Sequence, residues 1–140
     1  LHFLYSAMLQ QIGRENIGLK IGEFKEILDS AKGGSGFSFA DLAANIAGLA
    51  FAEYLTRNNK TALKSQDILV NRIDESIFFP FIHDLPEGIR EDNFIRIFGR
   101  MYSKSYNELE ANIDQRIAGL KLYGEANYEA TNAFDKNNSI

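Results

Sequence analysis

A glycine-rich segment between two helical patterns is the feature that most constrains the fold of this chain. Each glycine inside a helix costs about 1 kcal/mol relative to alanine, so the sequence Gly33-Gly34-Ser35-Gly36 predicts a turn. Before the turn, apolar residues recur at spacings of four, three and four, which is typical of the buried stripe of an amphipathic helix. That helix is predicted over 14–32, and its stripe consists of Ile17, Ile21, Phe24 and Leu28.

The segment after this turn predicts a second long helix. Ser38 is placed as its N-cap, and Asp41 stands three residues later in the position of a capping-box carboxylate. The alanine-rich run that follows has high helix propensity, so we expect a helix from about Phe39 to Arg57. Because the connecting turn is short, the two helices are expected to run antiparallel.

The remaining predicted helices are shorter. One occupies the first residues and ends near Gly13, and another lies around 94–101. A last helix is expected to begin at a capping box formed by Ser105 and Glu108. The apolar cluster at 68–73 is too brief for periodicity to separate helix from strand, and we favour helix.

One irregular segment interrupts this pattern. The range 77–88 holds both prolines, Pro80 and Pro86, among several phenylalanines, which predicts an ordered loop anchored by aromatic rings. We therefore predict an all-α fold, a compact bundle of about five helices with this proline- and Phe-containing loop.

The chain is expected to form a single helical domain over 1–140. Its length of 140 residues and its 45% hydrophobic content are sufficient for one core. The range 127–140 shows little periodicity and is predicted to be a frayed tail. The first residues begin inside an apolar pattern without an initiator methionine, so we expect that an N-terminal segment has been removed.

Charge and composition argue against several partners. A net charge of -4 without a dense basic run disfavours nucleic acid. The absence of cysteine excludes disulfides, thiolate catalysis and Cys-ligated zinc. The most apolar stretch, Leu42 to Leu55, spans roughly 14 residues and is interrupted by polar side chains, whereas a membrane-spanning helix needs about 20. We therefore predict no transmembrane span.

Small and polar residues form a stripe on each of the two long predicted helices. Because residues three and four apart share a helix face, each set lies in a line. The first stripe consists of Gly18, Gly22, Glu26 and Asp29, and the second consists of Asp41, Asn45, Gly48 and Ala52. If these faces meet, the glycines allow the two backbones to approach closely.

Such a meeting would gather the carboxylates of Glu26, Asp29 and Asp41 into a small space. Like charges in one site are relieved by a proton or a cation, so the cluster predicts either a divalent metal site or general acid–base chemistry. In this interpretation Asn45 and Asp29 contact a substrate, and His2, with Ser6 four residues on, supplies a nitrogen ligand or proton shuttle. The alternative is that Asp41 only caps its helix, the other carboxylates are solvated and the glycines serve packing.

The loop at 77–88 offers a second place for function. His83 could belong to a lid over the site and contact substrate, or it could be an ordinary surface histidine. The phenylalanines of the loop could form a partner surface, although aromatic residues beside proline more often anchor a loop to the core.

The order of the polar residues resembles that of a known group of bacterial proteins. His2-Phe3 stands near the start, Lys25-Glu26 and Asp29 follow, and then comes the run Gly36-Phe37-Ser38-Phe39-Ala40-Asp41-Leu42-Ala43-Ala44-Asn45-Ile46-Ala47-Gly48. Over residues 1–55 the chain resembles the VanZ-like proteins and the predicted periplasmic lipoproteins of the YfiM type. The resemblance implies shared polar positions at His2, Glu26, Asp41 and Asn45, with Gly48 as the packing residue.

The resemblance also implies a compartment, but it names no reaction. VanZ-like proteins are embedded in the membrane, whereas the helices predicted here carry too many charges to span a bilayer. The lipoprotein-like relatives are therefore the better match, and they imply a bacterial cell envelope location in the periplasm.

Two functional hypotheses follow, and neither establishes an enzyme class. In the first, an envelope-associated protein uses a carboxylate-rich polar site between the two long helices to bind a divalent metal or a polar cell-wall component. In the second, a non-catalytic module uses the aromatic loop at 77–88 to bind a protein partner.

Overall fold

The computed structural model describes residues 1–12, 34–71 and 74–124. Within these ranges the secondary structure is helical, apart from an isolated antiparallel bridge between Phe37 and Ile89. The predicted all-α bundle is therefore confirmed. The elements are α1 (His2–Ile12), α3 (Phe39–Thr56), α4 (Asn59–Asn71), the short 3-10 helix η1 (Glu75–Ile77), α5 (Glu91–Phe98) and α6 (Lys104–Ala118).

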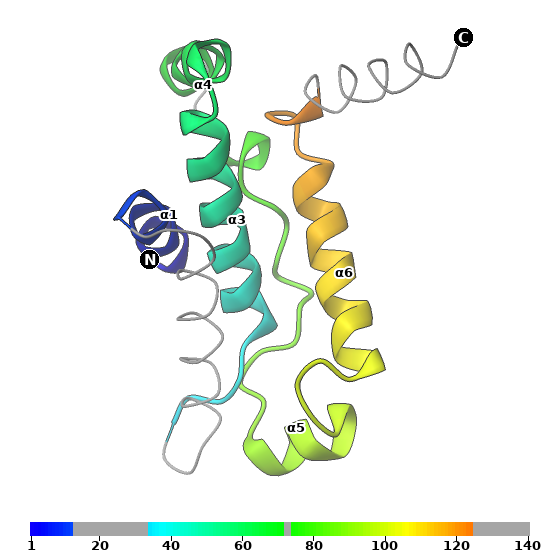
Figure 1. The fold of residues 1–140 in the computed structure, drawn as a ribbon. Helices are drawn as coiled ribbons and strands as arrows, with labels where there is room; N and C mark the ends of the chain where they lie inside the picture. Colours follow the sequence, from blue (N-terminus) through cyan, green and yellow to red (C-terminus); the bar gives the residue numbers. More distant parts are fainter. Residues whose placement is uncertain (13–33, 72–73, 125–140) are drawn as a thin grey trace, which may run out of the picture.

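Helix α3 is the centre of the arrangement. Figure 1 shows α6 beside α3 and running in the same direction, while α1 crosses α3 on its other side. Helix α4 turns away where α3 ends, and α5 lies below the two long helices. An extended segment after η1 passes between α3 and α6 and leads to α5. Helix α3 thus offers different faces to α1 and to α6.

Several predicted elements fall outside the described residues. These are the helix predicted over 14–32, with its carboxylates Glu26 and Asp29, and the tail predicted over 127–140. The predicted start of α3 is confirmed, because the Ser38 hydroxyl accepts a hydrogen bond from the backbone N–H of Asp41 at 3.0 Å. The N-terminal helix predicted to end near Gly13 is also confirmed, as α1.

The core forms where α3, α6 and the loop meet. Helix α3 contributes small and medium apolar side chains, and aromatic rings fill the space at its N-terminal end. The rings of Phe37, Phe39 and Tyr106 are at most 1% exposed and pack against one another. Complete burial of one such side chain contributes about 1.5–3 kcal/mol to folding, so this cluster is a main source of stability.

The predicted loop is ordered, as its aromatic residues indicated. Ile77 and Leu85 are buried in the core, and the backbone carbonyl of Ile77 accepts a hydrogen bond from the N–H of Leu122 at 3.1 Å. Two backbone hydrogen bonds join Phe37 and Ile89, at 2.8 and 2.9 Å, on the far side of the loop. Both ends of the loop are therefore fixed to other parts of the bundle.

An ion pair holds the middle of this loop to α6. The guanidinium of Arg116 donates two hydrogen bonds to the carboxylate of Asp84, at 2.6 and 2.8 Å. It also donates one to the backbone carbonyl of Phe81 at 2.8 Å. This bidentate geometry is the strongest form of the arginine–carboxylate interaction. The hydrogen bonds from Arg116 lower the pKa of Asp84 from its ordinary value of 3.8.

Acid should therefore weaken the fold through this pair. Because the folded-state pKa of Asp84 lies below the unfolded value, its stabilising contribution is present above about pH 3.8 and is lost as the pH falls further. We expect Asp84→Asn to lose less stability than the wild type on acidification, measured as the denaturant midpoint at each pH. Asp74, whose pKa is lowered by hydrogen bonds from Ser76, contributes equally in both proteins. Equal acid sensitivity of the two proteins would contradict this assignment.

The start of α6 differs from the prediction. The N-cap is Ser103, whose hydroxyl accepts a hydrogen bond from the N–H of Tyr106 at 3.3 Å, rather than the predicted Ser105. The side chain of Tyr106 is fully buried and extends the apolar stripe of α6 toward its N-terminus. With the cap at Ser103, Tyr106 is the third residue of the helix, and its N–H is in the position that a capping hydroxyl bonds.

Helix α4 is longer than the sequence indicated. The cluster at 68–73 favoured a short helix, whereas the observed helix begins at Asn59, two residues after Arg57. Asn58 permits this, because its side-chain oxygen accepts a hydrogen bond from the N–H of Thr61 at 3.0 Å. The buried residues in the first two turns of α4, Thr61 and Ser65, are polar, and Ile68 is the next residue that packs against the core, so hydrophobic periodicity could not reveal where the helix begins.

Candidate functional site at the crossing of two helices

A close approach of α1 and α3 forms the base of the candidate site. Gly48 lies directly against the backbone of Phe3, where an added Cβ would overlap the carbonyl oxygen. Small residues allow helix backbones to approach in this way. The predicted packing role of Gly48 is therefore observed against α1, whereas the helix predicted over 14–32 lies outside the described residues.

Two polar pairs flank this approach, one helix turn apart. At the N-terminal end of both helices, the His2 imidazole Nε2 lies 3.5 Å from the Asp41 carboxylate Oδ2. One turn further along, the Ser6 hydroxyl donates a hydrogen bond of 2.9 Å to the side-chain oxygen of Asn45. The i, i+4 spacing on each helix brings both pairs to one face of the crossing.

The two pairs differ in their exposure to water. The side chains of His2 and Asp41 are 22% and 43% exposed, so water and ligands reach them. Ser6 and Asn45 are 3% and 4% exposed. The crossing therefore combines a partly exposed polar pair with a buried polar pair.

The amide of Asn45 is only half satisfied. Its oxygen accepts from Ser6, whereas its buried nitrogen, Nδ2, has no hydrogen-bond partner among the described residues. A buried donor without a partner costs about 1–3 kcal/mol, so such groups are uncommon in folded proteins. An amide placed this way can donate a hydrogen bond to a ligand.

Three of the predicted site residues are thus brought together, namely His2, Asp41 and Asn45. Glu26 and Asp29, the other predicted carboxylates, lie outside the described residues. Sequence reasoning placed Ser6 on the face of His2 but missed its bond to Asn45. The matched i, i+4 spacing of the two polar pairs was the signal that could have indicated it.

His83 takes a different position. It is exposed and stacks edge-on against Phe81, with 5.5 Å between the ring centroids. The neighbouring Asp84 is bound to α6. The described contacts of His83 are therefore made within its own loop, and its predicted part in a lid over the site stays a prediction.

The metal prediction has two described candidate ligands. Over the described ranges, no group of three or more histidine, aspartate or glutamate side chains lies close enough to hold a metal ion. His2 and Asp41 form a pair, and the two remaining predicted ligands are outside these ranges. The metal site consequently stays a prediction.

The fold and this crossing define a broad class, that of all-α bundles with a polar site between two crossing helices. Compared with known proteins, the chain matches no protein-family model, no curated protein and no solved structure. None of the described helices has the length and apolarity needed to cross a membrane. The resemblance to VanZ-like and YfiM-type proteins is therefore still a prediction from the sequence.

Proposed function

We propose that this chain is a bacterial envelope protein, located in the periplasm, that binds a polar ligand at the crossing of α1 and α3. The sequence resemblance over residues 1–55 supports the compartment. The gathering of His2, Asp41 and Asn45 supports the binding role. The observation that carries the proposal is the buried Asn45 nitrogen, which has no partner among the described residues.

A polar cell-wall component is the first ligand class. Sugar hydroxyls and amide carbonyls offer oxygens that can accept the hydrogen bond of Asn45 Nδ2, which relieves the cost of the unsatisfied donor. Beside it, the imidazole of His2 and the carboxylate of Asp41 can accept hydrogen bonds from ligand hydroxyls. A histidine paired with a carboxylate is also suited to accept a proton as a general base.

A divalent metal is the second ligand class. Imidazole nitrogen and carboxylate oxygen are common metal ligands, and His2 and Asp41 present one of each. The predicted carboxylates Glu26 and Asp29 would add two more. Asn45 does not join this set in the observed arrangement, because its oxygen is engaged by Ser6 and its nitrogen is a donor.

Thermal unfolding tests both classes. The wild type is heated alone, with Mg²⁺, Ca²⁺, Mn²⁺ or Zn²⁺, and with muramyl dipeptide as a cell-wall probe. A ligand that binds only the folded state raises the unfolding midpoint, and we expect one of these probes to raise it by several degrees. Asp41→Asn should abolish that shift while the midpoint without ligand stays close to that of the wild type. Glu26→Gln should do the same if the ligand is a metal.

Asp92→Asn is the matched control. Asp92 is also an acidic residue in the first turn of a helix, but it belongs to α5, which does not form the crossing. This variant should keep the ligand-induced shift. The proposal fails if no probe raises the midpoint, or if Asp41→Asn keeps the full shift.

A non-catalytic interaction module that uses the loop at 77–88 is a second candidate function. One observation favours it, since the side chain of Phe81 is 65% exposed although its loop is fixed to α6 by Arg116. An exposed ring on a rigid loop is suited to serve as an anchor for a protein partner. In this case the polar crossing would serve folding, and Phe81 would be required for binding.

A further inference from the structure

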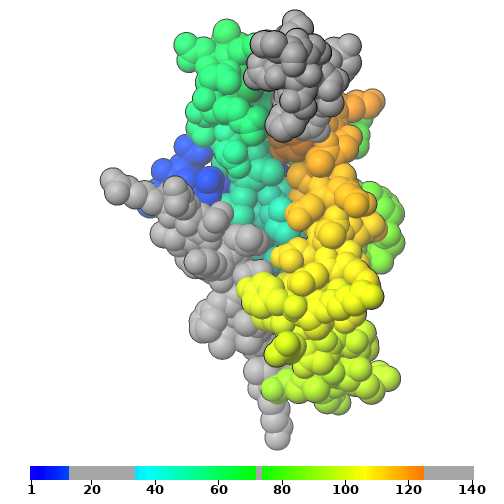
Figure 2. Space-filling view, turned by 45° about the vertical axis from the view of Figure 1, so that its right-hand side comes forward, coloured from blue at the N-terminus to red at the C-terminus, as the bar shows by residue number. Residues whose placement is uncertain are grey.

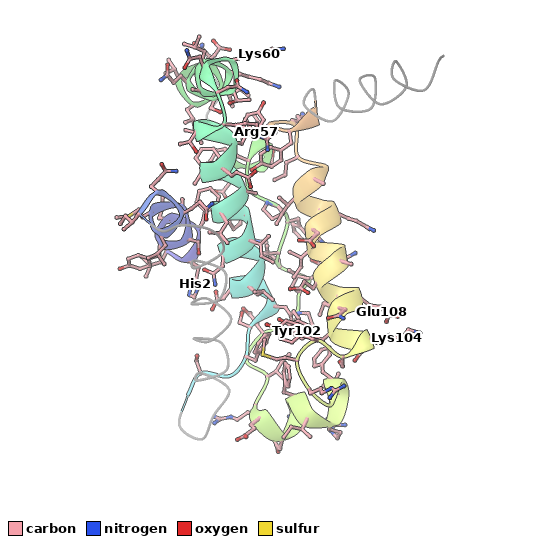
Figure 3. The ribbon with its side chains drawn as sticks, in the orientation of Figure 1. His2, Arg57, Lys60, Tyr102, Lys104 and Glu108 are labelled. Atoms are coloured by element: carbon pink, nitrogen blue, oxygen red, sulfur yellow. The ribbon has the colours of Figure 1, made fainter. Side chains whose placement is uncertain are left out.

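A second face of α3 borders a cavity that the polar crossing does not use. The residues that meet α1 lie along one line of the helix, whereas Ile46, Ala50, Glu53 and Arg57 lie along another. Between this second line, α6 and the turn that follows it lies a cavity of about 260 Å³. Figure 2 shows the surfaces of α3 and α6 meeting side by side, and Figure 3 shows Arg57 far from His2.

The lining combines an apolar body with a few polar groups. Its apolar part is contributed by α3 and α6 and by the rings of two tyrosines, Tyr54 and Tyr123, which contact edge to face at 5.2 Å. The polar groups are two carboxylates and one guanidinium. Small-molecule sites typically have this composition, with few polar groups fixing the orientation of an apolar ligand. The full lining is Ile46, Ala50, Glu53, Tyr54, Arg57, Asp114, Ile117, Ala118 and Tyr123.

Two polar groups of the lining have no partner among the described residues. The hydroxyl of Tyr123 is buried without a hydrogen bond, and the whole residue is 9% exposed. Burial raises the pKa of this phenol, so it stays neutral and keeps its proton at neutral pH. Asp114 makes no hydrogen bond or ion pair within the described part of the chain, and burial alone raises the pKa of its carboxyl. Both residues line the cavity and carry polar groups that no described residue engages.

The net charge of the lining residues indicates which kind of ligand the cavity favours. Arg57 pairs with Glu53 at 3.5 Å and lies over the Tyr54 ring at 5.6 Å from its centroid, so these two opposite charges compensate each other. The carboxylate of Asp114 is left without compensation, which gives the lining one net negative charge. Faces of tyrosine rings attract organic cations, and a phenol oxygen accepts hydrogen bonds from ammonium groups.

We propose that the cavity between α3 and α6 is a binding site for a small organic ammonium compound. The ammonium group pairs with Asp114 and donates a hydrogen bond to the Tyr123 hydroxyl, while the apolar part of the ligand packs between Ala50 and Ile117. This site is separate from the crossing of α1 and α3 and does not depend on the function proposed for it.

Three probes of similar size test the charge preference. Benzylamine is a cation at neutral pH, benzyl alcohol is neutral and benzoate is an anion. Each is titrated into the full chain while backbone amide signals are followed by NMR. We expect saturable shifts at Ala50 and Ile117 with benzylamine. Benzyl alcohol and benzoate should bind at least roughly ten-fold more weakly than benzylamine, as for the loss of one charge-assisted hydrogen bond.

Variants then locate the binding. Asp114→Asn keeps the shape of the side chain and should weaken the binding of benzylamine roughly ten-fold, because the ion pair is lost. Tyr123→Phe keeps the packing and should weaken the binding of benzylamine by a smaller factor. Asp92→Asn removes the same charge from α5 and should bind like the wild type.

Several results would overturn the proposal. Binding of benzoate or benzyl alcohol as tight as that of benzylamine would show that the cavity does not select cations. Unchanged affinity in Asp114→Asn, signal shifts confined to other parts of the chain, or no saturable binding at millimolar benzylamine would each reject this site.

Discussion

Replacing Gly48 by alanine should lower the free energy of unfolding by about 3 kcal/mol, the upper part of the range for overpacked interiors. The reason is steric, because the added Cβ would overlap the backbone carbonyl of Phe3 on α1. A backbone atom cannot rotate away as a side chain can, so α1 must move off α3. We also expect the Ser6–Asn45 hydrogen bond to be lost, since both residues lie at this contact. Chemical denaturation measures the stability change.

Gly124→Ala is the control for this substitution. An added Cβ at Gly124 would meet no heavy atom of the described residues within 4 Å, so the stability of this variant should stay within a few tenths of a kcal/mol of the wild type. If Gly48→Ala were as stable as Gly124→Ala, the close approach of the two helices would be wrong. The polar site built on that approach would then lose its basis.

Features set by local interactions were predictable from the sequence. The start of α3 depends on Ser38 and the residues just after it, and the observed bond to the N–H of Asp41 follows from that local pattern. The ordered loop was likewise indicated by prolines and aromatic residues within a few positions of one another. In such cases the residues that decide the structure are neighbours in the chain.

Contacts between segments far apart in the chain were harder to predict from the sequence. The polar stripe of Asp41, Asn45 and Gly48 was evident, but helical periodicity gives a face and not the element that packs on it. The observed partner includes Ser6 and Phe3, some forty residues earlier, as the bond from Ser6 to Asn45 spans 39 positions. The sequence therefore indicated which residues form the site, and the crossing of the helices shows which of them pair.

The same reasoning explains why the ammonium site escaped prediction. The sequence pattern places Asp114 on the polar side of the last helix, which predicts a solvated residue. Tyr123 follows that helix in a turn. Their meeting with Ala50 depends on how α3 and α6 lie against each other. Helix α3 consequently contributes to two different candidate sites, because one of its faces packs against α1 and another borders α6.

The largest loss of stability is expected at the aromatic cluster around the first residue of α3. Phe39 is the first residue of α3, is 0% exposed, and packs against the rings of Phe37, Phe98 and Tyr106 at 4.9 to 5.4 Å between centroids. Phe39→Ala removes these contacts and leaves a cavity that fixed neighbours cannot fill. We expect the free energy of unfolding to fall by about 4 kcal/mol, within the usual range for a buried phenylalanine.

Phe81→Ala is the matched variant, because it deletes the same ring from an exposed position. Its stability should change by no more than about 0.5 kcal/mol, as for other surface substitutions. Similar losses in the two variants, measured by denaturant unfolding, would contradict the observed packing. The same variant also bears on the two candidate functions. If a stable Phe81→Ala protein keeps the ligand-induced shift of its unfolding midpoint, the polar crossing binds its ligand without the exposed ring. Loss of that shift in a stable Phe81→Ala protein would instead couple the aromatic loop to the crossing.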